Sequence, residues 1–229
     1  MTQKNCKNIL FENRAEVARQ LLELLPTQQM KKNNWIVIAV SSGGFEIALA
    51  LAKKLKLDVD LLFNEAIMSP VNSECEIARV SETEEIVIHE LLVHSFEIQN
   101  DYIFGQAKRM YEDKILPDIY KFRKDSAFCS LYNRNVLLLD EGSETGMKLM
   151  VGIKSALEMK AKAIYVVAPV MPDDIVDNVN QLVDDVFCLY EVKDYLLTAS
   201  YYNDFPLIED EELAKLFEEK DKYEQRDKV

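Results

Sequence analysis

The stretch NVLLLDEGSETGMKL, residues 135–149, decides the fold of this chain. It opens with an apolar run of strand length, continues into the acids Asp140 and Glu141, and turns at Gly142 and Gly146. Residues with helical spacing follow the turn. A buried strand, a turn and a helix in this order form the repeating unit of an α/β fold with a parallel sheet.

The composition is that of an ordinary globular protein of 229 residues, of which 48% are hydrophobic and 29% are charged. The 27 lysines and arginines stand against 40 aspartates and glutamates, so the formal net charge is −13. Such a chain repels phosphate backbones and anionic membranes, which argues against nucleic acid or a membrane as partner. No stretch approaches the ~18 apolar residues that span a bilayer, and the N-terminus has no apolar signal core. We therefore expect a cytoplasmic protein.

Apolar patterns along the chain predict alternating helices and strands. Helices are predicted at residues 11–25, 45–56, 99–124, 145–160, 172–182 and 209–229. Apolar runs of strand length occupy residues 35–40, 57–63, 135–140, 163–170 and 185–190. Two shorter strands, at residues 77–81 and 85–89, are predicted to form a hairpin.

The predicted fold class is α/β, with a mainly parallel sheet flanked by helices and a short antiparallel hairpin. The sheet should be parallel because its strands are apolar throughout and therefore covered on both faces. One domain is predicted, with an N-terminal helix at 11–25, a core at about 35–208, and a solvated C-terminal helix with a charged tail at 209–229. Pro117 should kink or divide the long helix before the central strand.

The turn that follows Glu141 has residues suited to an anion. Its glycines, Gly142 and Gly146, have three residues between them, which excludes both the P-loop and the dinucleotide-binding motif. They allow a ligand to approach the backbone, while the amides of residues 143–146 would open the next helix towards an anion. Thr145 is predicted to be the N-cap of that helix.

Two acids stand beside this turn, at the carboxyl end of the predicted strand, where parallel sheets bind their ligands. Asp140 and Glu141 could accept hydrogen bonds from vicinal hydroxyls or help to hold a hydrated Mg²⁺ ion. A phosphate, a diol and a metal together describe a phosphorylated ribose.

Five segments carry a resemblance to a known family. DEGSETG resembles the phosphoribosyl pyrophosphate (PRPP) signature of type I phosphoribosyltransferases. SSGGFEIALALAKKL resembles the pyrophosphate loop of one subgroup of small bacterial members, and Pro70, Asn72 and Glu74 match its Pro-x-Asn-x-Glu segment. VIHELLV resembles its Asn-Glu-Glu strand end, and YYNDFPLIEDEEL is similar to its Tyr-x-Asp-Phe-Pro ending. The matches run in order from about Trp35 to Phe217.

The resemblance implies an enzyme of nucleotide metabolism, a homodimer that transfers a 5-phosphoribosyl group from PRPP to an acceptor and releases pyrophosphate. Asp140 and Glu141 would contact the ribose hydroxyls, and Gly43 and Gly44 would line the pyrophosphate side. Mg²⁺ would bind oxygens of pyrophosphate and of the diol. The 5′-phosphate would be held by the Thr145 hydroxyl and by the amides of Ser143, Glu144, Thr145 and Gly146.

Some positions depart from the subgroup on the pyrophosphate side. Ser42 stands where an arginine is usual, and Asn64 and Glu65 stand where Arg-Lys is usual. A carboxylate about 4 Å from pyrophosphate would cost on the order of 4 kcal/mol per charge pair at an effective dielectric constant near 20. Arg79 could restore one cation to the site, or could be a solvated or ion-paired surface residue.

The phosphate turn departs from the subgroup as well. Glu144 adds a negative charge, and Lys148 occupies a position where a hydroxyl residue is usual. Lys148 could reach the phosphate, or could pair with Glu144 four residues earlier.

Two interpretations of function remain. In the first, the chain is a Mg²⁺-dependent phosphoribosyltransferase whose missing cations come from elsewhere in the molecule or from a second subunit. In the second, it is a catalytically degenerate module that binds a phosphoribosyl compound or nucleotide in a regulatory role. The sequence does not identify the acceptor, because the hood that selects it varies within this fold.

Overall fold

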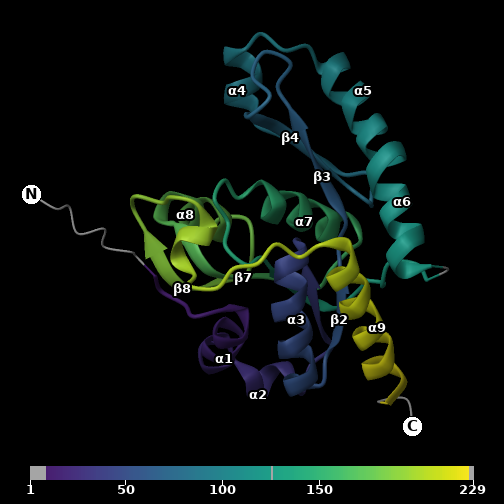
Figure 1. Ribbon diagram of the computed structural model, residues 1–229, viewed down its shortest axis with the longest axis vertical. Helices are drawn as coiled ribbons and strands as arrows, with labels where there is room; N and C mark the ends of the chain where they lie inside the picture. The colour runs from purple at the N-terminus through teal and green to yellow at the C-terminus, as the bar shows by residue number, and fades with distance from the viewer. Residues whose placement is uncertain (1–8, 125, 227–229) are drawn as a thin grey trace, which may run out of the picture.

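The computed structural model describes residues 9–124 and 126–226, and its centre is a parallel sheet (Figure 1). The sheet has five strands in the order β2-β1-β6-β7-β8, and each neighbouring pair runs parallel. The strands are β1 (Trp35–Ala39), β2 (Asp58–Leu61), β6 (Asn135–Leu139), β7 (Ala163–Pro172) and β8 (Asp185–Val192). The predicted α/β class with a mainly parallel sheet is therefore confirmed.

Helices cover both faces of the sheet (Figure 1). One face packs against α1 (Arg14–Leu24), α3 (Ser42–Leu55) and α9 (Asp210–Arg226), and the other against α7 (Met147–Glu158) and α8 (Asp173–Asn180). The short helix α2 (Thr27–Met30) joins α1 to the first strand.

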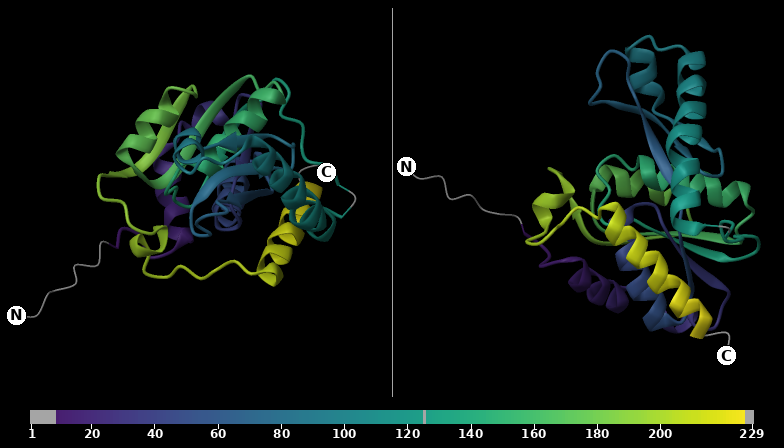
Figure 2. Two further views of the ribbon diagram at one scale, coloured as in Figure 1. Left: turned by 90° about the horizontal axis from the view of Figure 1, so that it is seen from above. Right: turned by 45° about the vertical axis from the view of Figure 1, so that its right-hand side comes forward.

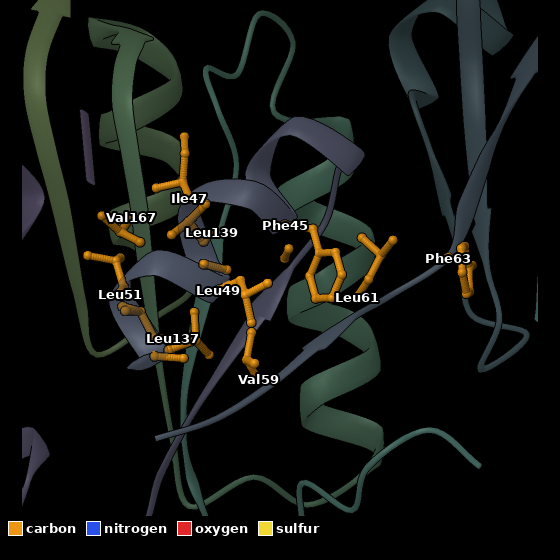
Figure 3. Close-up of a cluster of buried hydrophobic side chains, with 14 of the residues drawn as sticks. Phe45, Ile47, Leu49, Leu51, Val59, Leu61, Phe63, Leu137, Leu139 and Val167 are labelled. Atoms are coloured by element: carbon orange, nitrogen blue, oxygen red, sulfur yellow. The ribbon is translucent and has the colours of Figure 1, made fainter. Parts of the chain in front are cut away.

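Successive residues of the central strands serve opposite faces, as the pleat of a strand requires. Leu137 and Leu139 of β6 pack with α3, whereas Leu138 between them packs with α7. Figure 3 shows the α3 side of this core, where Ile47 and Leu51 lie against the sheet. Burial on both faces explains why these strands are continuous apolar runs in the sequence.

A second, antiparallel sheet projects from the core together with the longest helical segment (Figure 1; Figure 2). We call this projection, residues 64–124, the hood. Its strands β3 (Asn64–Met68), β4 (Glu76–Ser81) and β5 (Ile86–Ile88) lie in the order β3-β4-β5. The hairpin of β4 and β5 was predicted, but β3 was not, because polar Asn64 and Glu65 interrupt its apolar pattern.

After its strands, the hood contains the short helix α4 (Glu90–Ser95) and then a long helical segment that alternates between α-helix and π-helix. The predicted helix at 99–124 consists of α5 (Asn100–Met110), the π-helix η1 (Tyr111–Ile115), α6 (Leu116–Asp118) and the π-helix η2 (Ile119–Arg123). Pro117 lies in α6, between the two π-helices, and the helical run continues through it, so the segment is not divided. Proline has no N–H to donate within a helix, and wider i→i+5 turns accommodate the interruption.

The C-terminal helix α9 is not the solvated helix that its charge suggested. Leu213, Leu216 and Phe217 are buried, and the Phe217 ring lies 4.9 Å from the ring of Phe45 in α3. These apolar positions recur at helical spacing among the acids, so one face of α9 belongs to the core. A final short 3₁₀ helix, η3 (Thr198–Tyr201), precedes it. No helix in residues 9–124 and 126–226 is long and apolar enough to cross a lipid bilayer.

Candidate functional site

The candidate site lies where two neighbouring strands end. In the parallel pair of β1 and β6, Ala39 is level with Leu139, so the turns that follow the two strands meet at the same edge of the sheet. The amide of Val40 donates to the carbonyl of Leu139 at 2.9 Å, which fixes the two strand ends to each other. The glycine pair of the first turn and the acids of the second are thereby brought together.

Ser41 joins the two turns through its hydroxyl. The hydroxyl oxygen accepts a hydrogen bond from the Gly44 amide at 3.1 Å and so caps helix α3. The same hydroxyl donates to Oδ1 of Asp140 at 2.6 Å. Asp140 Oδ1 also accepts from the amide of Glu141 at 2.9 Å. Asp140 is 1% exposed, and its other oxygen, Oδ2, has no hydrogen-bond partner among the described residues.

Glu141 is held by an arginine from the N-terminal helix. Nε of Arg14 donates to Oε2 of Glu141 at 2.6 Å, and Arg14 is only 4% exposed. The guanidinium carbon also lies 4.3 Å from the centre of the Phe205 ring. Burial raises the pKa of Glu141, while the charge of Arg14 opposes that rise. Both acids of the predicted site are therefore turned inward.

Arg14 was not predicted from the sequence, although α1 carried a signal. Arg14 occupies the buried stripe of its helix together with Val17, Ala18 and Leu21. An arginine at the end of an apolar stripe is seldom buried without a partner. The partner, Glu141, is 127 residues away along the chain, which is why no local pattern identified it.

The two glycines of the first turn are required by close packing. A Cβ on Gly43 would lie 1.7 Å from Oε2 of Glu141 and 2.6 Å from Nε of Arg14. A Cβ on Gly44 would lie 3.0 Å from the carbonyl oxygen of Leu139. The second turn and its ion pair therefore occupy the space above this glycine pair.

The second turn depends on two residues with positive φ, Gly142 at +145° and Gly146 at +74°. The prediction that Thr145 caps the next helix, with the helix starting there, is wrong. Gly146 is the N-cap and α7 begins at Met147, because the left-handed conformation at Gly146 ends the turn one residue later. The Thr145 hydroxyl accepts from the amide of Met147 at 3.4 Å.

The amides of this turn have different roles. The Ser143 amide donates to the carbonyl of Val170 at 3.3 Å, so the fold already uses it. The amides of Glu144, Thr145 and Gly146 have no hydrogen-bond partner within the part of the chain that the structure describes. They stand at the N-terminal end of α7, where the helix dipole favours an anion.

Three side chains in and next to the C-terminal 3₁₀ helix hold the second turn by hydrogen bonds, two of them directly. The Tyr202 hydroxyl donates to the carbonyl of Glu141 at 2.6 Å, and the Thr198 hydroxyl donates to that of Gly142 at 3.4 Å. Tyr195 forms a 2.8 Å hydrogen bond with Thr198. Burial raises the pKa of the Tyr195 and Tyr202 hydroxyls, which remain protonated donors. These residues fix the backbone of the turn.

The three positions of the pyrophosphate side that depart from the subgroup lie around one small pocket. Ser42, Asn64 and Glu65 line a cavity of about 140 Å³ together with Asp118 and Asp210. None of the described residues that line the cavity is a lysine or arginine. Burial raises the pKa of the Glu65 and Asp118 carboxyls. The pocket next to the glycine turn is therefore acidic.

Arg79 lies near this pocket, but its donors are already engaged. Nε and one terminal nitrogen donate to Glu76 at 2.7 and 3.1 Å, and the other terminal nitrogen donates to Oδ1 of Asn64 at 2.7 Å. The residue is 8% exposed, so the expectation of a surface arginine is wrong, although it is ion-paired. Asn64 in turn donates to the carbonyls of Val40 and Leu62, at 3.0 and 2.8 Å.

Lys148 lies in the first turn of α7 and is half-buried. Among the described residues it forms no ion pair, so the alternative in which it pairs with Glu144 is not observed. Its charge lowers the pKa of Glu141. Glu144 and Thr145 precede it in the turn, and Glu144 is exposed.

The chain is similar to curated proteins named "Putative phosphoribosyl transferase" from two strains of Mycobacterium tuberculosis, CDC 1551 / Oshkosh and H37Rv. The identity is 24% over 209 residues, which cover 90% of this chain and 46% of each relative. The chain thus spans about half the length of the curated relatives it matches. No family model matches it.

Among solved structures, TT1426 from Thermus thermophilus superposes with a TM-score of 0.74 at 21% identity, over 91% of this chain and 98% of that one. A purine phosphoribosyltransferase from Pyrococcus horikoshii gives a TM-score of 0.45 at 14% identity, over 88% and 99% of the two chains. The likeness to TT1426 shows the fold. The resemblance seen in the sequence is confirmed by the name of the curated relatives.

Proposed function

We propose that this chain, which has a type I phosphoribosyltransferase-like fold, transfers a 5-phosphoribosyl group from PRPP to an acceptor and releases pyrophosphate. The observation that carries the proposal is the N-terminal end of α7, where the amides of Glu144, Thr145 and Gly146 lack partners among the described residues. This phosphate cradle directly follows the two acids, as a phosphorylated ribose would require.

In this proposal the 5′-phosphate binds the phosphate cradle. The free amides donate to its oxygens, and the helix dipole adds a favourable partial charge. The hydroxyl of Thr145 supplies a further donor, and Lys148 supplies a cation from the first turn of α7. Gly142 and Gly146 keep the backbone in the shape that presents these amides.

The two acids, Asp140 and Glu141, would accept hydrogen bonds from the ribose hydroxyls. Oδ2 of Asp140 is a buried acceptor without a partner among the described residues, which suits a hydroxyl donor or a metal-bound water. Glu141 is the second acceptor, once its side chain turns away from Arg14.

Mg²⁺ fits this site through the ligand rather than through the protein alone. The described residues contain no cluster of three or more aspartates, glutamates, histidines or cysteines that could hold a metal ion. The free oxygen of Asp140 would contact the water shell of an ion held mainly by pyrophosphate and diol oxygens. When bound, Mg²⁺ would neutralise negative charge on the leaving group. The chain itself contributes positioning of the two ends of the substrate.

The acidic pocket favours a second candidate, a module that binds a phosphoribosyl compound or nucleotide without transferring it. Glu65 and Asp118 would oppose the charge that develops on departing pyrophosphate, whereas Asp210 is paired with Lys121. The two candidates share the phosphate cradle and differ on the pyrophosphate side. Pyrophosphate release with a panel of acceptors distinguishes them, because only the enzyme produces it.

We also propose a homodimer that forms through the hood. Phe104 and Tyr120 on its helical segment are 53% and 71% exposed, and Leu91 of α4 is 76% exposed. Large exposed apolar side chains on one projection are typical of a surface that another chain covers.

Calorimetric titration of PRPP, with and without Mg²⁺, tests the proposed function. We expect a dissociation constant below about 5 mM, which corresponds to roughly 3 kcal/mol of affinity. Binding should be lost in Asp140→Asn and Thr145→Ala, and retained in the control Ser73→Ala, which removes an exposed hydroxyl from another turn. Absence of binding by the wild-type protein at about 5 mM, a value set by the same affinity relation, would contradict the proposal.

A further inference from the structure

Arg14 is a buried cation next to the glycine turn. Its Nε lies 2.6 Å from Glu141 Oε2, and a terminal nitrogen lies 3.6 Å from Glu46 Oε2. A Cβ on Gly43 would lie 2.6 Å from the same Nε. The guanidinium therefore reaches the surface of the turn that the family resemblance assigns to pyrophosphate.

The carboxylate of Glu141 occupies the place of an anion at this turn. It lies directly over Gly43, in the first turn of α3, and it is paired with the only positive charge that the described residues place in contact with it. The amides of Ser42 and Gly43 have no hydrogen-bond partner among the described residues. A helix N-terminus with a cation beside it attracts negative charge, and here the chain supplies that charge itself.

The buried cation Arg79 does not offer an alternative. Arg79 donates to Glu76 and Asn64, and the pocket around Ser42 is acidic. An incoming pyrophosphate group would therefore find its nearest buried positive charge at Arg14, behind the Glu141 carboxylate. Binding of a second anion there without movement would place two like charges in contact, which strongly disfavours it at this depth.

Only the side chain of Glu141 is free to move. Its amide donates to Asp140, and its carbonyl accepts from the Tyr202 hydroxyl at 2.6 Å, so the backbone is held on both sides. Burial also disfavours the charged carboxylate in its present position. Rotation of the side chain would uncover Gly43 and release Arg14 without changing the turn.

We propose that Arg14 is the residue that binds the pyrophosphate-side anion of the ligand. Until that anion binds, the Glu141 carboxylate occupies the anion's position, and binding of the anion displaces it. The inference rests on the proposed function for the identity of the ligand. Glu141 then turns towards the ribose hydroxyls, so anion binding at Arg14 and hydroxyl binding at Glu141 are coupled. Arg14 takes over the role of the arginine that Ser42 replaces.

Titration of inorganic pyrophosphate into wild type, Glu141→Gln and Arg14→Gln tests the exchange. Glutamine has nearly the same shape and can still accept from Arg14, but it lacks the competing charge. We expect Glu141→Gln to bind pyrophosphate about tenfold more tightly than wild type, and Arg14→Gln to bind it about tenfold more weakly. Glu46→Gln is the matched control, because Glu46 also lies near Arg14 but not over Gly43. Its effect should stay below about threefold.

Equal or weaker pyrophosphate binding by Glu141→Gln would overturn the proposal, as would a Glu46→Gln effect of the same size. Binding that is undetectable in both wild type and Glu141→Gln would overturn it too. Thermal unfolding of each variant shows that it is folded, and Glu141→Gln alone decides the matter if Arg14→Gln does not fold. Ribose 5-phosphate is titrated in parallel. If it fails to bind wild type while the pyrophosphate results hold, the proposed function fails and the exchange at Arg14 stands.

Discussion

The Glu141 carboxylate fills the space that a side chain on Gly43 would need, because the oxygen Oε2 lies 1.7 Å from where a Cβ of residue 43 would be. The need for a glycine at position 43 is thus explained by the ion pair of Glu141 and Arg14 above it, as well as by any ligand that binds there. This relationship joins three distant parts of the chain, α1, the turn after β1 and the turn after β6.

Gly43→Ala should separate Glu141 from Arg14. The new methyl group would push the carboxylate away and leave a buried guanidinium without its closest partner, at a cost of about 2 to 4 kcal/mol in the free energy of unfolding. Urea denaturation measures this. The matched control is Gly105→Ala in α5, where a Cβ meets nothing within 4 Å, and where alanine should stabilise the helix by about 0.5 to 1 kcal/mol. Equal effects of the two substitutions would contradict the packing argument.

Arg123→Ala should destabilise the protein strongly, because Arg123 joins the hood to the core. Its Nε lies 3.3 Å from Asp60 of β2, and one terminal nitrogen donates to Glu82, next to β4, at 2.8 Å. Removing the arginine leaves the buried Glu82 without its cation and leaves Asp60 with only Lys220, whose Nζ lies 3.9 Å from Asp60 Oδ1, which costs about 3 to 5 kcal/mol. Chemical denaturation should show this loss. Lys108→Ala, which breaks the exposed pair with Glu112, should cost less than about 0.5 kcal/mol.

The strands that could be predicted from the sequence are those whose environment is uniform. Residues 135–139 and 163–170 are apolar because helices cover both faces of the sheet, and that pattern is local. Strand β3 could not be found in this way, because Asn64 and Glu65 at its start are polar and half-buried. Its pairing with β4 is a tertiary contact, and the residues of β3 alone do not predict it.

The position of the candidate site at a strand end could be predicted from the sequence, but the ion pair between Arg14 and Glu141 could not. The two acids and the glycines of the second turn lie together at a strand end, as expected from their order in the chain. The left-handed conformation of Gly146 moved the helix start to Met147, which a sequence with Thr145 available as a cap does not reveal. Arg14 could not be assigned either, because ion pairing between distant segments depends on how the helices dock.

Sedimentation velocity should show a dimer at high micromolar concentration if the hood forms the proposed interface. Phe104→Glu should shift the protein towards the monomer, because Phe104 is 53% exposed and a buried charge at an interface is costly. Tyr132→Glu is the control, since Tyr132 is 68% exposed but lies outside the hood. A wild-type protein that sediments as a monomer at this concentration would exclude the interface.

Glu65→Gln should stabilise the protein at neutral pH and lose this effect in acid. Burial, opposed by the charge of Arg79, raises the folded-state pKa of Glu65 above its ordinary value of 4.5. The folded protein therefore binds more protons than the unfolded chain in the window just above pH 4.5, and the contribution of Glu65 to stability falls as the pH rises through that window.

Below this window the carboxyl is protonated in both states, so the glutamine variant and wild type should unfold at nearly the same denaturant concentration. Above it the charged carboxylate is penalised in the folded state only, and glutamine, which cannot ionise, avoids the penalty. Denaturant midpoints measured from acid to neutral pH follow the difference. Glu74→Gln, at an exposed position, should change the free energy of unfolding by less than about 0.5 kcal/mol. A destabilisation by Glu65→Gln at neutral pH that disappeared in acid would mean that Glu65 acts chiefly as the ion-pair partner of Arg79.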